Sequence, residues 1–343
     1  MIIKMKKYYL FKEKSNHFIL KSINKMFLFF LFLILIILYF IINCYVLTSM
    51  VKKRNNKVIN EVKDSIKSYK NNVLNTTNNM KHAILLLSSY GIEYLNNFLV
   101  QFNNDKRYDI YIHLDGKTKS DIDKKKTIID SNIKYCQHKY KAERFSIEMV
   151  DAMYELLSIA YKSDNYDYYH FFSESCYLVK SLDKFYDFFV ENNLNSYVSH
   201  YKNQDFLYKN KSHILYKGSQ WMSLHKKIVR KLLVNKDLYN KYKEEIKNGT
   251  IIITHGAIDE FIIQNMIIHD ICNETPKKYK IINDDLRFVR WSCNNTYCPN
   301  YLNIDNISEY EINKIKERYL IIRKINFKDA KAIELVNKLK NMS

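Results

Sequence analysis

Residues 82–87 read His-Ala-Ile-Leu-Leu-Leu, a short and almost continuous apolar run. Such a run is typical of a strand that is buried on both faces of a sheet. Apolar residues at helical spacing follow over 92–102, and the run Tyr-Asp-Ile-Tyr-Ile-His-Leu-Asp at 108–115 ends on the carboxylate of Asp115. The order of strand, helix and strand predicts that the folded domain opens with a β-α-β unit.

The same alternation continues along the chain. It predicts a helix over 146–163, a strand over 168–173, a helix over 180–190 and a strand over 196–200. Later segments predict helices over 223–233 and 258–269, a strand over 287–291, a helix over 308–318, a strand over 319–325 and a helix from 329. Alternation of this kind indicates an α/β fold with a mainly parallel central sheet flanked by helices. Because ligands bind beyond the carboxyl ends of such strands, we expect Asp115 and residues 173–175 at the mouth of a site.

An apolar segment at 26–47 is long enough to cross the hydrocarbon layer as one helix. A cleaved signal peptide is the alternative, but a tail of 25 residues precedes the segment and no small-residue cleavage pattern follows it. We therefore expect a tail at 1–25, a membrane anchor at 26–47, a stem at 48–80 and a folded domain at 81–343.

The orientation of this anchor is not decided by charge, because residues 1–25 and 48–72 hold seven basic residues each. A short basic tail, one span near the start and a foldable domain beyond it are typical of type II proteins of the secretory pathway. We therefore expect a cytoplasmic tail, and a domain that faces the lumen of a Golgi-type or ER-type membrane.

The net charge of +19 raises the question of nucleic-acid binding. Residues 1–80 hold fourteen Lys and Arg against three Asp and Glu, which leaves a charge of only +8 on the other 263 residues. The folded part is mildly basic and carries no nucleic-acid motif. We therefore expect no nucleic-acid partner.

The cysteines and sequons are compatible with a luminal glycoprotein. Five of the six cysteines follow the predicted span, at positions 136, 176, 272, 293 and 298, and they allow two disulfides and one free thiol. A zinc site at Cys293 and Cys298 is the alternative, although a single pair without a second pair or a histidine partner is a weak metal signal. Seven Asn-x-Ser/Thr sequons also occur, many of them expected by chance in so Asn-rich a chain.

Two segments carry candidate chemistry. Residues 217–221 read Lys-Gly-Ser-Gln-Trp, and Ile258-Asp259-Glu260 follows at the start of a predicted helix. A glycine turn that presents polar groups and a Trp, with two carboxylates nearby, suits a protein that holds a sugar next to a base. The pattern indicates carbohydrate transfer.

Several ordered blocks together resemble one known family. They are Ile-His-Leu-Asp at 112–115, Phe-Ser at 145–146 with the helix over 150–157, the blocks at 217–221 and 258–260, Leu-Arg-Phe-Val-Arg-Trp at 286–291, Cys-Pro-Asn at 298–300, and Leu-Ile-Ile-Arg-Lys-Ile at 320–325. Over residues 81–326 the chain resembles the core-2/I-branching N-acetylglucosaminyltransferases and the peptide O-xylosyltransferases, which form glycosyltransferase family 14. The resemblance implies a GT-A type fold and an inverting transfer of GlcNAc or xylose from a UDP-sugar to a glycan or protein hydroxyl, without a metal ion.

By this resemblance Glu260 is the base that takes the proton of the acceptor hydroxyl, and Asp259 helps to position the acceptor. A place in the first turn of a helix favours the ionised form of Glu260. The alternative is that both carboxylates only complement the helix N-terminus. A glycoside hydrolase is disfavoured, because two adjacent carboxylates point in different directions and cannot face each other across a bond.

The donor side is expected to involve Asp115, Arg323 and Lys324. By resemblance, Asp115 accepts hydrogen bonds from the nucleotide, while Arg323 and Lys324 meet the charge on the departing diphosphate. The strand end at 113–116 offers one Asp and no Asp-x-Asp motif, which is consistent with transfer without a metal. The alternative is that both cations are exposed ends of a strand.

Two aromatic residues and one altered block also bear on the acceptor. Trp291 is expected to lie against the acceptor sugar, with a buried core Trp as the alternative, while Trp221 is expected to pack the turn at Gly218. Residues 173–180 read Ser-Glu-Ser-Cys-Tyr-Leu-Val-Lys where the family has Ser-Gly-x-Asp-Tyr-Pro-Leu-Lys. This departure leaves a second hypothesis open, a catalytically inactive glycan-binding membrane protein on the same fold.

Overall fold

The computed structural model describes residues 80–129, 132–203, 206–208, 211–212, 215–253, 257–271, 279–291 and 299–341, together with residues 48, 59 and 63. The chain divides into two units, Met1–Thr76 and Thr77–Ser343, and the second is described below. The predicted tail and membrane span lie outside the described residues, and so does nearly all of the predicted stem. Of the helices in the described part of the chain, none combines the length and the apolar character that a membrane crossing needs.

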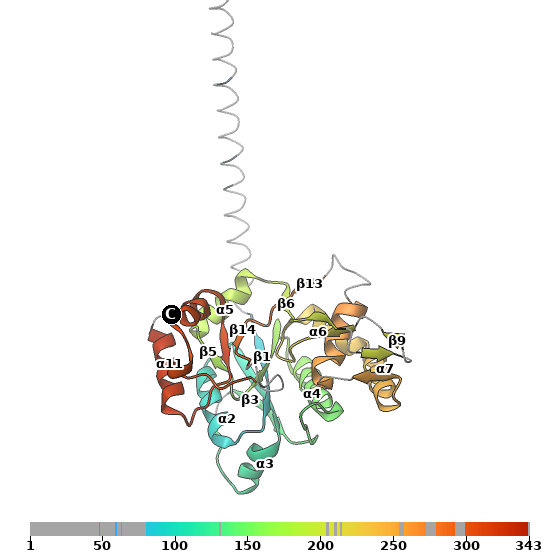
Figure 1. Ribbon diagram of the computed structural model, residues 1–343, viewed down its shortest axis with the longest axis horizontal. Coiled ribbons are helices and arrows are strands. Elements are labelled where there is room, and N and C mark those ends of the chain that lie inside the picture. The colour runs from blue at the N-terminus through green and yellow to red at the C-terminus, as the bar shows by residue number, and fades with distance from the viewer. Residues whose placement is uncertain are drawn as a thin grey trace, which may run out of the picture. The chain divides into compact units, whose positions relative to one another are not determined.

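A central sheet of seven strands organises the second unit (Figure 1). Its order is β13 (Lys280–Ile282), β6 (Asn195–Tyr197), β11 (Ser223–His225), β4 (Tyr168–Ser173), β1 (His82–Ser88), β2 (Tyr108–Leu114) and β3 (Ile133–Gln137). Every neighbouring pair is parallel except the two pairs made by β11, which runs antiparallel to β4 and to β6. The predicted α/β class and mainly parallel sheet are confirmed.

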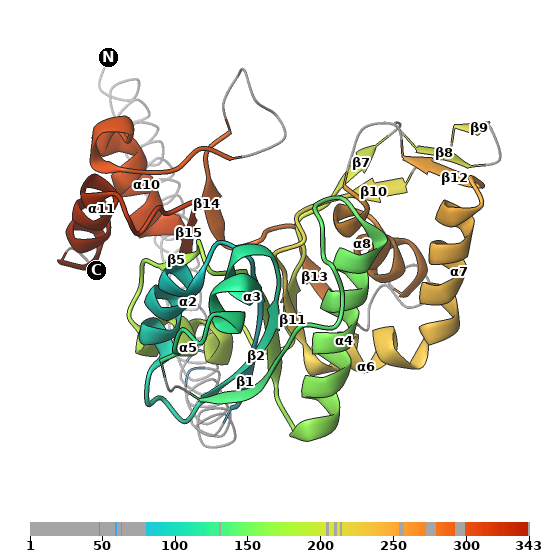
Figure 2. The same cartoon turned by 90° about the horizontal axis from the view of Figure 1, so that it is seen from below.

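Helices cover both faces of this sheet, which is why β1 is apolar without alternation (Figure 2). Ala83, Leu85 and Leu87 face one core, with α4 (Ile147–Ser163), α6 (Lys226–Val234) and α8 (Ile262–Asn265). The alternate residues of β1, Ile84 and Leu86, face the other core, with α2 (Ile92–Leu99) and α5 (Leu182–Glu191).

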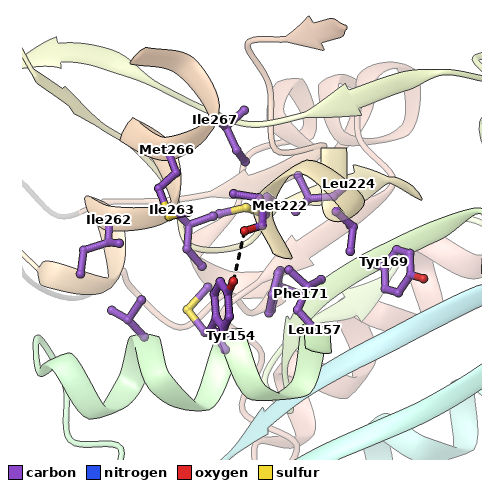
Figure 3. Close-up of a cluster of buried hydrophobic side chains, with 14 of the residues drawn as sticks. Tyr154, Leu157, Tyr169, Phe171, Met222, Leu224, Ile262, Ile263, Met266 and Ile267 are labelled. Atoms are coloured by element: carbon purple, nitrogen blue, oxygen red, sulfur yellow. Dashed lines mark hydrogen bonds between the residues drawn. The ribbon is translucent and has the colours of Figure 1, made fainter. Parts of the chain in front are cut away.

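Figure 3 shows the first of these cores in detail. Tyr154 and Leu157 of α4 pack beneath Phe171 of β4, and Ile263 of α8 closes the cluster from the opposite side. The hydroxyl of Tyr154 donates to the carbonyl oxygen of Leu232 at 3.1 Å, so this buried polar group is satisfied. The core thereby fixes α8, and the short segment before it, against α4.

Smaller elements lie around the central sheet. One three-stranded sheet joins β14 (Arg287–Val289), β15 (Ile321–Arg323) and β5 (Tyr177–Leu178), beside α10 (Glu309–Arg318) and α11 (Ala330–Asn341). At the opposite end of the molecule lie β7 (Tyr201–Asn203) with β10 (Leu215–Lys217), β8 (Phe206–Tyr208) with β9 (Lys211–Ser212) and β12 (Ile251–Ile253), and α7 (Lys236–Lys247). Short 3-10 turns occur at η1 (Val100–Phe102) and η4 (Ile304–Asn306).

Two predicted helices are wrong in part. The helix expected over 223–233 begins only at Lys226, because residues 223–225 are buried and pair with β4 as a strand. The helix expected over 258–269 is three pieces, namely the 3-10 turn η2 (Ile258–Glu260), α8 and the π-helical η3 (Met266–Ile271). The strands predicted near 287–291 and 319–325 form, but in the small sheet.

A buried histidine pair lies in the middle of the sheet. Nδ1 of His82 on β1 lies 2.9 Å from Nε2 of His170 on β4, and Nδ1 of His170 lies 2.9 Å from Oγ of Ser223. Burial lowers the pKa of His82 to about 3 and holds the pKa of His170 well below its ordinary value of 6.5. Both rings are therefore neutral in the fold.

We expect the protein to lose stability as the pH falls from 6.5 towards 3, because the unfolded chain then binds protons that the fold excludes. Each buried imidazole contributes about 1.4 kcal/mol per pH unit in this window. The free energy of unfolding, measured by urea titration at several pH values, should show a smaller slope in His82→Gln. The exposed His269→Gln is the control, and equal slopes in all three proteins would contradict the prediction.

Candidate active site

The carboxyl ends of β1, β2 and β4 meet at one edge of the central sheet, as the sequence predicted. Asp115 follows β2, and its backbone N–H donates to the carbonyl oxygen of Ser88 at the end of β1. Oδ1 of Asp115 accepts from the N–H of Gly116 at 2.7 Å and so caps α3 (Gly116–Asp123), a helix that the sequence did not reveal. This bond fixes the direction in which the carboxylate of Asp115 points.

The two segments with candidate chemistry lie side by side. The N–H of Gly218 donates to the carbonyl oxygen of Glu260 at 3.0 Å, and the side chain of Gln264 donates to the carbonyl oxygen of Ser219 at 2.9 Å. A Cβ on Gly218 would lie 1.7 Å from the carbonyl oxygen of Ser199, so this position admits only glycine. The turn thus presents Lys217 to Glu260, whose Oε2 lies 3.6 Å from the Lys217 ammonium.

Both carboxylates of η2 hold protons more tightly than free carboxylates do. Burial raises the pKa of Glu260, against the opposing charges of Lys217, Arg323 and Arg144. Asp259 is buried, and its Oδ1 has no hydrogen-bond partner among the described residues. Burial and the neighbouring charge of Glu260 raise the pKa of Asp259 to about 7. We expected a place in the first turn of a helix to favour the ionised form of Glu260, but η2 is only a three-residue 3-10 turn and burial raises the pKa of Glu260.

Arg323 is buried at the end of β15 and is 6% exposed. Its Nη1 donates to Oγ of Ser173 at 2.9 Å, and its guanidinium lies 4.4 Å from the ring centroid of Trp221. Its charge also lowers the pKa of Glu260, so it belongs to the same site.

Lys324 is 3% exposed, which excludes the alternative that these cations are exposed strand ends. Its ammonium lies 4.7 Å from the ring centroid of Tyr90 and 5.0 Å from that of Tyr301. Two adjacent buried cations are costly unless anions or π-faces compensate them, which makes this region suited to an anionic ligand.

The two tryptophans lie in different environments. Trp221 is buried, its ring lies 4.4 Å from the guanidinium of Arg323, and its carbonyl oxygen accepts from Nη1 of the buried Arg287 at 2.7 Å. Trp291 is 52% exposed, so the alternative of a buried core Trp is wrong. It precedes residues 292–298, which are not among the described residues.

Sequence reasoning missed several residues of the site. They are Lys217, Arg144, Glu174, Arg287 and the two tyrosines that flank Lys324. A signal was present at three of them: Lys217 and Arg287 stand in blocks that carry the resemblance, and Glu174 replaces the glycine of the resembled family. Arg144 and the two tyrosines depend on contacts between segments far apart in the chain.

The structure tests the metal and disulfide expectations only at the residues that it describes. Within the described ranges, no group of three or more His, Cys, Asp or Glu side chains is arranged to hold a metal ion. Cys136 and Cys176 are free thiols, whereas positions 272, 293 and 298, including the candidate zinc pair, lie outside those ranges.

Comparison with known families assigns the chain to one family of enzymes. A family model described as "Core-2/I-Branching enzyme" matches residues 84–316. The chain belongs to the Core-2/I-branching enzyme family, and the resemblance seen in the sequence blocks is confirmed. Comparison with curated proteins gave no match.

Two solved glycosyltransferases are similar to this chain at low sequence identity. The apo form of the glycosyltransferase GlyE of Streptococcus pneumoniae is 10% identical with a TM-score of 0.37, over 77% of this chain and 63% of that chain. This chain therefore spans less than two thirds of the GlyE chain. A glycosyltransferase involved in glycosylation of the major capsid of PBCV-1 is 12% identical with a TM-score of 0.33, over 76% of this chain and 99% of that chain. The assignment to the family therefore rests on the family match and not on these structures.

We expect Gly218→Ala to destabilise the fold by about 2 kcal/mol or more and to abolish transfer, because the backbone at Ser199 must move to admit a methyl group. Thermal unfolding and transfer assays check this. Gly249→Ala is the control. No atom lies within 4 Å of the place that its methyl group would occupy, although its φ of +74° favours glycine, so it should cost stability but not activity. Retention of wild-type stability and activity by Gly218→Ala would contradict the prediction.

Proposed function

We propose that the chain is a type II membrane-anchored, inverting glycosyltransferase of the GT-A type. It transfers GlcNAc or xylose from a UDP-sugar to a hydroxyl of a glycan or protein acceptor and needs no metal ion. The observation that carries the proposal is the placement of Glu260, a carboxylate with a raised pKa, within the electrostatic reach of the buried Arg323. A base and a phosphate-binding cation are the two groups that this reaction requires.

The proposed reaction is a single displacement at the anomeric carbon. The acceptor oxygen forms a bond to that carbon while the bond to the diphosphate oxygen breaks, and UDP leaves from the opposite face. Glu260 takes the proton of the acceptor hydroxyl. Because burial raises the pKa of Glu260, its ionised form is a stronger base than the carboxylate of an exposed glutamate. One displacement inverts the configuration, so an α-linked donor gives a β-linked product.

Arg323 and Lys324 supply the positive charge for the leaving diphosphate in this proposal. Both are held by other side chains before any ligand arrives, so little reorganisation is needed during the reaction. The single carboxylate at the end of β2 supports metal-independent transfer. Asp115, oriented by its bond to Gly116, is the proposed partner of the nucleotide.

The acceptor side and the cellular location rest on separate observations. The exposed ring of Trp291 suits stacking against an acceptor sugar. The Oδ1 of Asp259, which lacks a hydrogen-bond partner within the part of the chain that the structure describes, suits a hydrogen bond to one of its hydroxyls. The composition of residues 26–47 supports an anchor in a secretory-pathway membrane with the catalytic domain in the lumen.

The first test is UDP release by the purified chain across a panel of UDP-sugars, with glycan and peptide acceptors, in the presence and absence of EDTA. We expect release that resists EDTA and that falls by a factor of about 10² to 10⁴ in Glu260→Gln, because the base is lost. Glu155→Gln, which changes a carboxylate of α4 paired with Lys139, is the matched control and should stay active. Loss of all activity in EDTA would overturn metal independence. A folded protein that binds glycans but releases no UDP would support the inactive glycan-binding alternative.

The pH dependence tests the role of Lys217. Its charge opposes the burial that raises the pKa of Glu260, so Lys217→Met should raise this pKa further. Transfer needs the ionised base, so the acid limb of the kcat/KM profile should move to higher pH, with about tenfold lower activity below the limb for each unit of displacement. Lys226→Met removes a cation paired with Asp167 and serves as the control. Superimposable acid limbs in the wild type and in Lys217→Met would exclude Glu260 as the titrating base.

A further inference from the structure

Glu174 is a wholly buried carboxylate in the turn that follows β4. It stands where the resembled family has glycine, so it belongs to the block that departs most from the family pattern. Oε1 accepts hydrogen bonds from the backbone N–H groups of Ser89 and Tyr90, at 2.5 Å each. Among the described residues Oε2 has no hydrogen-bond partner. A buried carboxylate in this state is costly, which indicates that it does something a glycine cannot.

The hydrogen bonds of Glu174 fix the loop between β1 and α2 and therefore fix Tyr90. The ring of Tyr90 in turn lies 4.7 Å from the ammonium of Lys324. An attraction between a cation and an aromatic face depends on the position of the ring, so a displaced loop would release the lysine side chain. Glu174 thus acts on Lys324 through Tyr90.

The two neighbours of Glu174 in the chain, Ser173 and Ser175, contact the segment that carries Arg323 and Lys324. Oγ of Ser173 accepts from Nη1 of Arg323 at 2.9 Å. The carbonyl oxygen of Ser175 accepts from the N–H of Ile325 at 3.0 Å, directly after Lys324. Burial raises the pKa of Glu174, and the positive charge of Arg323 partly opposes this rise. The two groups therefore interact electrostatically.

We propose that Glu174 is a positioning residue that holds Tyr90 and, through it, sets Lys324 beside Arg323 to receive the diphosphate of the donor. The inference rests on the proposed function, because it takes a nucleoside diphosphate as the ligand. It predicts that Glu174 contributes to recognition of the second phosphate and not to recognition of the nucleoside. A residue that only stabilised the fold would affect both alike.

The experiment is a calorimetric titration of the purified chain with UDP and with UMP, which lacks the second phosphate. We expect the wild type to bind UDP at least about tenfold more tightly than UMP, since one charge-assisted contact gives that ratio. In Glu174→Ala the ratio should fall below about threefold while the affinity for UMP changes by less than about twofold. Lys324→Ala should give the same pattern, and combining the two changes should lower UDP affinity little further, because both remove one contact.

Variants of Glu174 and of Tyr90 separate a role in positioning Lys324 from a general loss of stability. Glu174→Gln keeps an oxygen that can accept from both backbone N–H groups, so it should retain most of the preference for UDP. Tyr90→Phe keeps the ring face over Lys324 and should retain the preference, whereas Tyr90→Leu should lose it. If Glu174→Ala does not fold, the two tyrosine variants decide the matter.

The outcomes distinguish this inference from the proposed function. A wild type that folds but binds neither UDP nor UMP overturns the proposed function, and the inference with it. A wild type that prefers UDP, together with a Glu174→Ala protein that keeps the preference, overturns only the inference. Equal weakening of UDP and UMP binding in Glu174→Ala, or loss of the preference in Glu174→Gln, also overturns it.

Discussion

Burial of charge at the carboxyl edge of the sheet is the constraint on which the rest of the site depends. Arg323 and Lys324 are both nearly inaccessible, and Glu174 and Asp259 are buried in the same unit of the chain. Each such group alone would cost several kcal/mol. Arg323, Lys324 and Glu174 are compensated by a hydroxyl, by ring faces or by backbone N–H groups. Asp259 is not compensated in this way, and burial raises its pKa instead. The surrounding loops are held in place by these contacts.

The central sheet could be predicted because its signal is local. The strands at 82–88, 108–114 and 168–173 are buried along their whole length, so each is mostly apolar in the sequence, with few polar residues in each run. The strand β11 could not be predicted in this way, since three residues give too short a pattern and the helix α6 follows at once. The helix α7 was missed because most of its residues are polar and only Tyr239 and Tyr242 are buried.

Only those parts of the site that belong to a local sequence motif could be predicted. The glycine turn at Gly218 and the carboxylates of η2 are adjacent, as the pattern suggested, and the hydrogen bond between Gly218 and Glu260 gives the reason. The support of the cations could not be predicted. Arg323 and Ser173 are 150 positions apart, and Lys324, directly after β15 of the small sheet, lies beside Tyr90, which follows β1 of the central sheet. Such pairings follow from how the small sheet packs on the large one, which no local pattern encodes.

The electrostatic coupling of Glu260 to Arg323 and Lys217 links donor binding to the strength of the base. Both cations now lower the pKa of Glu260 against the effect of its burial. In the proposed reaction an arriving diphosphate would bring negative charge to the same region and offset part of the field of Arg323. The proton affinity of Glu260 would then rise when the donor is in place. Glu260 would then be the stronger base only when the donor is bound, so it would take the acceptor proton when the leaving group is already held. This is a physical reason for placing the base and the phosphate-binding cations in one buried cluster.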